Sequence, residues 1–464
     1  MSAVMAEVRA ANVGRPHFRF NGLIPVAGLV LLIFMVPFGG LAAVITTVPA
    51  VLLLIALYLP VVAAFSRAEN DVKVARAMWI GFGAKLFGFV TRFVVITSVY
   101  DGADFKAYHL AASTLAPLYR SGNFFVPVPG VARGQGTLAL SVITGLIYTM
   151  TGSSLIVGAL VFSLLSFTGL VLCIKAFRLA VPDADHPRYA RLVLYVPSLF
   201  FWPSSIGKDA WMIFGLGVLA YGASRVYVRC GGGLVLIFLG IAVSGVVRPH
   251  IALVAFGAAA LGLVFRRVRN GERKKMNMVG KVVLLVPLVF SGLFLLTKAQ
   301  TFLKIDDLSV ESVQAAGAQA GARTNQGGSS FTPIPVRNPA QLPLALVTVL
   351  FRPFPFEVRT VLSFGISLEA SFLFLFTLIA WRRILAGLRA VPRSPFLALC
   401  GVYTLAFVAA FSNIANFGIL ARERVQVYPF FFAFLAAVPT LAARKAASRG
   451  ERVTANPARA EQPV

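Results

Sequence analysis

The stretch FFWPSSIGKDAWMIFGLG, from Phe200 to Gly217, decides how the chain is interpreted. It lies inside a longer segment, Leu192 to Ser224, in which almost every residue is apolar. Lys208 and Asp209 nevertheless stand side by side at its centre. Two charges in such a segment either occupy a turn between two membrane spans or are buried in a functional site, because charge inside a bilayer is costly.

The composition is that of a membrane protein. Of the 464 residues, 58% are hydrophobic and 13% are charged, and the mean hydropathy is +0.82, values typical of a chain that crosses a membrane many times. The net charge of +26 would also suit a nucleic-acid-binding protein. Most Lys and Arg residues, however, flank apolar runs, which is the pattern that orients membrane helices. We therefore expect no nucleic-acid partner.

The apolar runs predict an all-α polytopic protein with about twelve transmembrane helices, since a span needs roughly 20 apolar residues. Two further segments, 137–150 and 343–356, are short and flanked by Gly or Pro, and we expect them to be interfacial or re-entrant helices in two outer loops. The predicted spans are 23–39, 41–65, 79–99, 153–174, 191–206, 210–228, 233–247, 250–265, 281–297, 360–381, 396–413 and 425–443.

This layout predicts that both termini are cytosolic, because most of the 43 Lys and Arg residues then fall on the inner side. The first run is expected to be a retained signal anchor. A composition rich in Ala, Val and Arg suggests the cytoplasmic (inner) membrane of a bacterium. The expected parts are a cytosolic N-terminus at 1–22, a transmembrane domain at 23–443 with outer loops 100–136 and 298–359, and a basic cytosolic tail at 444–464.

The first outer loop contains two acidic residues in YDGADFKAYH, residues 100–109. A helix beginning there would present Asp101, Asp104 and Tyr108 on one side, and His109 would follow directly. The structural alternative is that Asp101 only caps the helix.

Two very short outer turns carry further polar residues. Asp209 is expected either to cap the next helix or to join a site, and Lys208 either to extend to the lipid headgroups or to contact a ligand. The turn in VVRPHIAL contributes Arg248 and His250. His250 alone is weak evidence of function.

Several arginines complete the set. Arg352 lies near Glu357 in LFRPFPFE and fits either a site or an exposed ion pair at the membrane surface. Lys and Arg normally collect in cytoplasmic loops, so the two arginines of ARERVQ, which the layout places on the outer side, are expected to have a specific role there. Arg92 lies within a predicted span, where a charge requires a partner or a polar cavity. The arginine pair of ARERVQ is Arg422 and Arg424.

Together these residues predict a site at one membrane face, assembled from loops that are distant in sequence. Arginine grips phosphate, and a carboxylate accepts a proton from a hydroxyl. No Cys, His or acidic pattern indicates a metal, so no cofactor is expected, although a divalent metal is compatible with the acidic residues. The predicted ligand is a lipid-linked phosphate at the outer leaflet.

The first outer loop, the following IYTMTGSS segment and the later YVPSLFFWPSSIGKDAW resemble the GT-C superfamily of integral-membrane glycosyltransferases over residues 79–228. The resemblance implies a polyprenyl-phosphate donor and an acidic catalytic residue in the first outer loop. Asp104, with Tyr108 four positions later, matches that acid best, and Asp101 is second. Asp209 matches the acid of the second outer loop, whereas Lys208 is not part of the family pattern.

The leading hypothesis is transfer of a sugar from a polyprenyl-phosphate lipid donor to a glycan, lipid or protein acceptor outside the membrane. Asp104 would be the base, and Arg92, Arg248, Arg422 or Arg424 would bind the phosphate. An envelope polysaccharide polymerase or ligase acting on lipid-pyrophosphate glycans is the second hypothesis, and it depends on the arginines more than on Asp104. A transporter or flippase is the third, although no internal repeat is visible.

Overall fold

The computed structural model describes the chain over residues 47–98, 104–127, 135–265, 309–325, 329–358 and 360–438, with isolated positions 293, 296, 297 and 300. The secondary-structure elements of these residues are all helices. One isolated β-bridge pairs Ser330 with Asn416. Contacts divide the chain into two units, Met1–Pro60 and Val61–Val464. The all-α class predicted from hydropathy is confirmed for the described residues.

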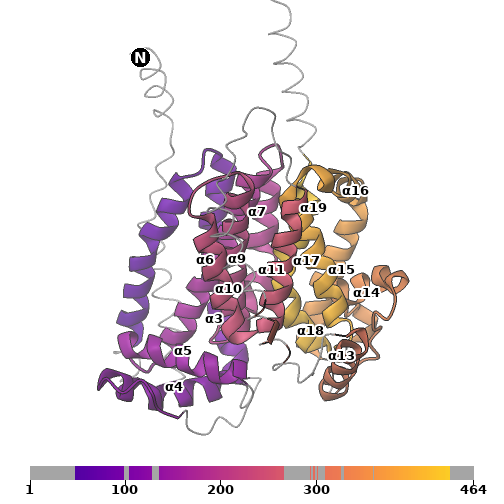
Figure 1. The fold of residues 1–464 in the computed structure, drawn as a ribbon. Coiled ribbons are helices and arrows are strands. Elements are labelled where there is room, and N and C mark those ends of the chain that lie inside the picture. Colours follow the sequence, from indigo (N-terminus) through magenta and orange to yellow (C-terminus); the bar gives the residue numbers. More distant parts are fainter. Residues whose placement is uncertain are drawn as a thin grey trace, which may run out of the picture. The chain divides into compact units, whose positions relative to one another are not determined.

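The helices of the larger unit fall into three groups along the chain (Figure 1). The first group is α3 (Val72–Ser98), α4 (Asp104–Arg120), α5 (Gln135–Thr151) and α6 (Leu155–Ala180). The second is α7 (His186–Tyr195), α8 (Pro197–Phe201), α9 (Lys208–Tyr227), α10 (Gly233–Val247) and α11 (Pro249–Val264). The third is α13 (Val310–Thr324), η1 (Pro339–Gln341), α14 (Leu342–Phe351), η2 (Pro355–Glu357), α15 (Val361–Ile379), α16 (Trp381–Ala390), η3 (Val391–Arg393), α17 (Pro395–Phe411), α18 (Phe417–Glu423), η4 (Arg424–Gln426) and α19 (Tyr428–Ala436).

Among the described residues, three helices are long and apolar enough to cross a membrane, namely Thr47–Arg67, α3 and α6. A fourth candidate is a pair bent by 68°, Ser363–Ile379 followed by Trp381–Arg393. Helices such as α10, with 15 residues, extend only about 23 Å at 1.5 Å per residue, less than a typical hydrocarbon core of about 30 Å. The structure therefore supports a membrane protein. Helix length and composition identify three or four membrane-spanning candidates among the described residues, fewer than the twelve spans expected from the sequence.

Close backbone packing joins α6, α9 and α10. A Cβ atom on Gly217 of α9 would lie 2.2 Å from the carbonyl oxygen of Gly169 in α6, and one on Gly240 of α10 would lie 2.5 Å from the amide nitrogen of Leu219. Small residues let helix backbones approach where lipid removes the usual hydrophobic drive for association. These three helices pack closely together, and the N-terminal end of α9 carries Lys208 and Asp209.

The predicted span 191–206 is wrong as a single helix. The chain breaks before Pro197, because a residue that precedes proline disfavours the helical region, and Val196 is extended. A short α8 and a non-helical turn follow. Buried side chains donate to the carbonyls that this break leaves without helical partners: Lys85 Nζ lies 2.9 Å from Pro203 O, and Ser166 Oγ lies 2.6 Å from the same atom. Donors of this kind make a broken helix tolerable in an apolar interior.

Candidate functional site

The candidate site is built from the ends of four elements: the first turn of α4, the start of α9, the corner between α10 and α11, and the segment α18–η4. Figure 1 shows α4, α5 and α18 toward one end of the larger unit. The turn between α8 and α9 delivers Lys208 and Asp209, and the corner delivers Arg248. The non-helical turn in the opening stretch thus has a positional role, since it places two charged residues at the start of a helix.

Asp209 pairs with Arg422. Its Oδ2 atom lies 2.7 Å from Arg422 Nε, and the residue is 3% exposed. The neighbouring Asp209 carboxylate raises the pKa of Arg422 above its ordinary value. The expectation that Asp209 caps α9 is not met, since Gly207 occupies the cap position and makes no side-chain cap bond. Instead, the ion pair of Asp209 with Arg422 holds α18 against α9.

Arg248 pairs with Glu423 through two hydrogen bonds, one from each terminal guanidinium nitrogen. Gln426 Nε2 donates to Glu423 Oε2 at 2.7 Å. Arg248 and Glu423 are buried, so each charge depends on the other. The positive charges of Arg248 and Arg422 are therefore balanced by carboxylates within the protein.

Lys208 differs from these two arginines because its hydrogen-bond partner is neutral. Lys208 Nζ donates to Thr137 Oγ1 of α5 at 3.1 Å. Burial, and then repulsion from the nearby Arg248, lower the pKa of Lys208 to about 8, while Asp104 opposes the shift. The ammonium does not extend away from the protein toward headgroups, as the structural alternative expected.

Asp104 and Tyr108 face this group from the first turns of α4. Tyr108 is 1% exposed, and burial, followed by the charge of Asp104, raises its pKa to about 12. The charges of Arg422 and Asp209 also act on this hydroxyl. Asp104 itself is exposed at the first residue of the helix. An accessible carboxylate and a buried phenol at the start of α4 therefore share one electrostatic neighbourhood with a lysine at the start of α9.

Two predicted site residues have other partners. His109 lies on α4 with its Nδ1 atom 2.8 Å from Tyr148 Oη of α5, and burial lowers its pKa. Arg92 stacks on the Trp202 ring, with 4.5 Å between its Cζ atom and the ring centroid. His109 thus helps join α4 to α5, and Arg92 packs against the broken segment after α8.

His250 occupies the first turn of α11, two residues after Arg248. Asp101 lies outside the described residues.

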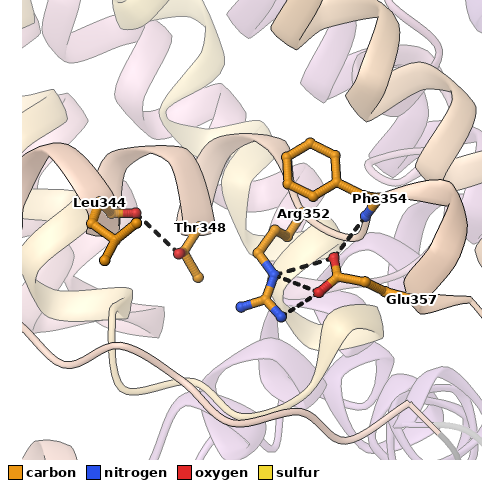
Figure 2. Close-up of polar contacts among 5 residues, drawn as sticks. All are labelled: Leu344, Thr348, Arg352, Phe354 and Glu357. Carbon is orange, nitrogen blue, oxygen red and sulfur yellow. Dashed lines mark hydrogen bonds and ion pairs between the residues drawn. The ribbon is translucent and has the colours of Figure 1, made fainter.

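Arg352 and Arg424 form a separate group in which Arg352 pairs with Glu357, as Figure 2 shows. Arg352 Nε lies 2.9 Å from Glu357 Oε1, and Glu357 Oε2 accepts from the Phe354 amide at 2.8 Å. Arg424 is fully buried and donates to the Arg352 carbonyl at 2.7 Å. These contacts indicate that Arg352 stabilises the segment after α14, and that Arg424 of η4 holds this segment in place. Of the arginine pair in ARERVQ, only Arg422 joins Asp209.

Three residues that contact the site were not predicted from the sequence, namely Thr137, Glu423 and Gln426. Glu423 had a visible signal, because it separates two arginines in ARERVQ on the side of the membrane where positive charge is unexpected. Thr137 had none, since a single threonine in an apolar helix is ordinary. No cluster of three or more potential metal ligands occurs in the described part of the chain.

In comparisons with known proteins, no family model, curated protein or solved structure matches this chain.

Proposed function

We propose that the protein is a membrane-embedded glycosyltransferase that moves a sugar from a polyprenyl-phosphate donor to a glycan, lipid or protein acceptor. The observation that carries the proposal is the grouping of exposed Asp104 with Lys208, beside two buried ion pairs that hold Arg248 and Arg422. A base and a phosphate-binding cation are the two groups that such a transfer requires. The proposed setting is a bacterial cytoplasmic membrane, with about twelve spans, cytosolic termini and the site at the outer face.

In the proposed reaction, Asp104 accepts the proton of the acceptor hydroxyl as its oxygen attacks the anomeric carbon of the donor sugar. The bond from that carbon to the phosphate oxygen breaks, and polyprenyl phosphate leaves with the electron pair, giving inversion at the anomeric carbon. Lys208 stabilises the charge on the departing phosphate. Tyr108 keeps its proton at neutral pH because its pKa is about 12, so it acts as a hydroxyl that positions the acceptor or the carboxylate.

Replacing Asp104 by Asn tests this assignment. The change removes the base but keeps the size of the side chain, so we expect transfer to fall at least about 100-fold, the lower range for general-base catalysis. Transfer is measured in proteoliposomes with a panel of labelled polyprenyl-phosphate sugars and a membrane lipid or glycan extract as acceptor.

The matched control is Asp183→Asn, which changes an exposed carboxylate in the turn between α6 and α7. It should leave transfer unchanged. Full activity of Asp104→Asn in a correctly folded preparation would refute the role of Asp104.

The alternative enzyme, acting on lipid-pyrophosphate glycans, would depend on the arginines and not on Asp104. The observation that favours this alternative is the position of Arg422, which pairs with Asp209 and keeps a side chain that is 29% exposed. Loss of activity in Arg422→Ala together with normal activity in Asp104→Asn would favour it.

A further inference from the structure

The helix α16 has the surface of a helix that lies in a membrane interface. Its sequence WRRILAGLRA places Trp381, Leu385 and Leu388 on one side, because residues three and four apart share a helix face. These side chains are 55%, 36% and 50% exposed. A large apolar face left open on a short amphipathic helix is typical of one that inserts among lipid headgroups.

A second face of α16 is basic. Arg382 and Arg389, seven residues apart, lie beside the apolar face and are exposed, and Arg393 follows in η3. Within the described chain no ion pair engages these three arginines. The Arg382 guanidinium lies over the Trp381 ring, 5.6 Å from its centroid. Tryptophan and arginine together at the edge of an apolar face match the chemistry of the headgroup layer.

A third face fixes the helix to the protein. Gly387 packs so closely on α19 that an added Cβ atom would lie 3.2 Å from Phe434 O. Arg383 pairs with Asp185 at 3.0 Å and donates to Leu435 O at 3.1 Å and Val438 O. The orientation of the other two faces is therefore set by the fold.

The position of α16 places it at the end of α17 opposite the candidate site, and thus on the opposite membrane side if α17 crosses the bilayer. It is bent by 68° from the preceding apolar helix α15. If α15 crosses the bilayer, the axis of α16 is therefore more nearly parallel to the membrane surface. It joins the start of α17, whereas α18 follows the end of α17 (Figure 1). The 17 residues of α17 separate the two ends by about 26 Å.

We propose that α16 and η3 bind anionic phospholipid headgroups at this face, with Arg382, Arg389 and Arg393 contacting lipid phosphates while Trp381, Leu385 and Leu388 lie among the acyl chains. Charge complementarity selects the occupant: exposed arginines that no ion pair engages within the described residues attract the negative surface of phosphatidylglycerol more than zwitterionic phosphatidylcholine. The proposal requires membrane insertion but not the transferase activity.

Quenching of Trp381 fluorescence by brominated lipid tests the proposal. The full chain is reconstituted in vesicles of brominated phosphatidylglycerol or brominated phosphatidylcholine, and the Trp381 signal is the difference between the native chain and Trp381→Phe. We expect phosphatidylglycerol to bind near Trp381 at least about fivefold more strongly than phosphatidylcholine, the effect of roughly one well-placed charge. Equal quenching by the two lipids, or no quenching of Trp381 by either, would overturn the proposal.

The variant Arg382→Gln/Arg389→Gln should lose this preference while Trp381 remains accessible to lipid. Its matched control is Arg323→Gln/Arg337→Gln, which removes two exposed charges, one from α13 and one from the segment before η1, and should keep the preference. A preference that survives in the first variant, or disappears equally in the second, contradicts the assignment. If the first variant does not fold, the preference of the native chain must weaken as salt shortens the Debye length from about 10 Å to about 3 Å; a salt-independent preference overturns the proposal.

Discussion

Lys208 is the residue of the candidate site whose charge should respond to pH near neutrality. Its pKa is about 8, below the ordinary value of 10.5, because it is buried beside Arg248. The lysine is therefore protonated at pH 7 and loses its charge as the pH rises through about 8. Arg248 and Arg422 differ from it because each is paired with a carboxylate.

The proposed role of Lys208 predicts a pH dependence of transfer. Above about pH 8, kcat/KM should fall as the ammonium of the free enzyme deprotonates. In Lys208→Arg the guanidinium stays charged, so this alkaline limb should disappear or move upward by more than one pH unit, even if the maximal rate is lower. A pH profile of kcat/KM for both proteins measures the effect, and an identical alkaline limb in the two would contradict the role of Lys208.

The pair of Arg248 and Glu423 predicts a thermodynamic coupling. Glu423→Gln leaves a buried guanidinium without its counter-charge, which typically costs about 3–5 kcal/mol of stability. The double variant Arg248→Gln/Glu423→Gln should recover part of that loss, since neither partner is then an unpaired buried charge. Thermal unfolding of the detergent-solubilised proteins gives the double-mutant cycle, and strictly additive losses would show that the two side chains do not stabilise each other.

At the scale of elements, the site depends on helices that meet through small residues. Gly169 and Gly217 bring α6 and α9 into backbone contact, and this contact determines where Lys208 and Asp209 emerge. The break at Pro197 matters equally, because it leads into the short α8 and the non-helical turn that precedes α9. The hydropathy pattern predicted α9 and α10 closely, as 210–228 and 233–247. It missed the break because the composition remains apolar through it.

The glycine contact predicts that a bulky residue at Gly217 disrupts the bundle. A Cβ atom there would meet Gly169 O at 2.2 Å, so Gly217→Leu should force the helices apart and cost at least about 1–3 kcal/mol. Gly257→Leu is the matched control, since a Cβ atom at Gly257 in α11 meets nothing within 4 Å. Size-exclusion chromatography of extracted protein should show aggregation only for Gly217→Leu. Two equally well-behaved variants would contradict the close packing of α6 and α9.

At the scale of the molecule, the candidate site and the basic helix α16 lie at opposite ends of α17. This separation follows from the chain order, because α16 leads into α17 through η3 and α18 follows it. If the larger unit spans a membrane, one face would carry the candidate chemistry and the other would carry arginines directed at lipid phosphates. The same division underlies the predicted orientation, with the basic face in the cytosol.

Cysteine labelling tests that orientation. Cys230, in the turn between α9 and α10, is exposed, whereas Cys173 and Cys400 are buried. A membrane-impermeant maleimide should therefore label Cys230 in inside-out vesicles but not in intact spheroplasts. The substitution Ser121→Cys, in the exposed turn after α4, should show the opposite pattern in a Cys230→Ser background. Labelling of both positions from the same side would contradict the arrangement.

The sequence by itself determined that the described chain is helical and apolar, and it directed attention to Lys208, Asp209, Arg248 and Arg422 as charges in short connections. Hydropathy and periodicity are local properties, so they can be read without the fold. The pairing of those charges was decided only by the tertiary structure: Asp209 with Arg422, Arg248 with Glu423, and Lys208 with Thr137. Each pair joins helices that are distant in sequence, and the partner of a buried charge depends on which helix ends the packing brings together.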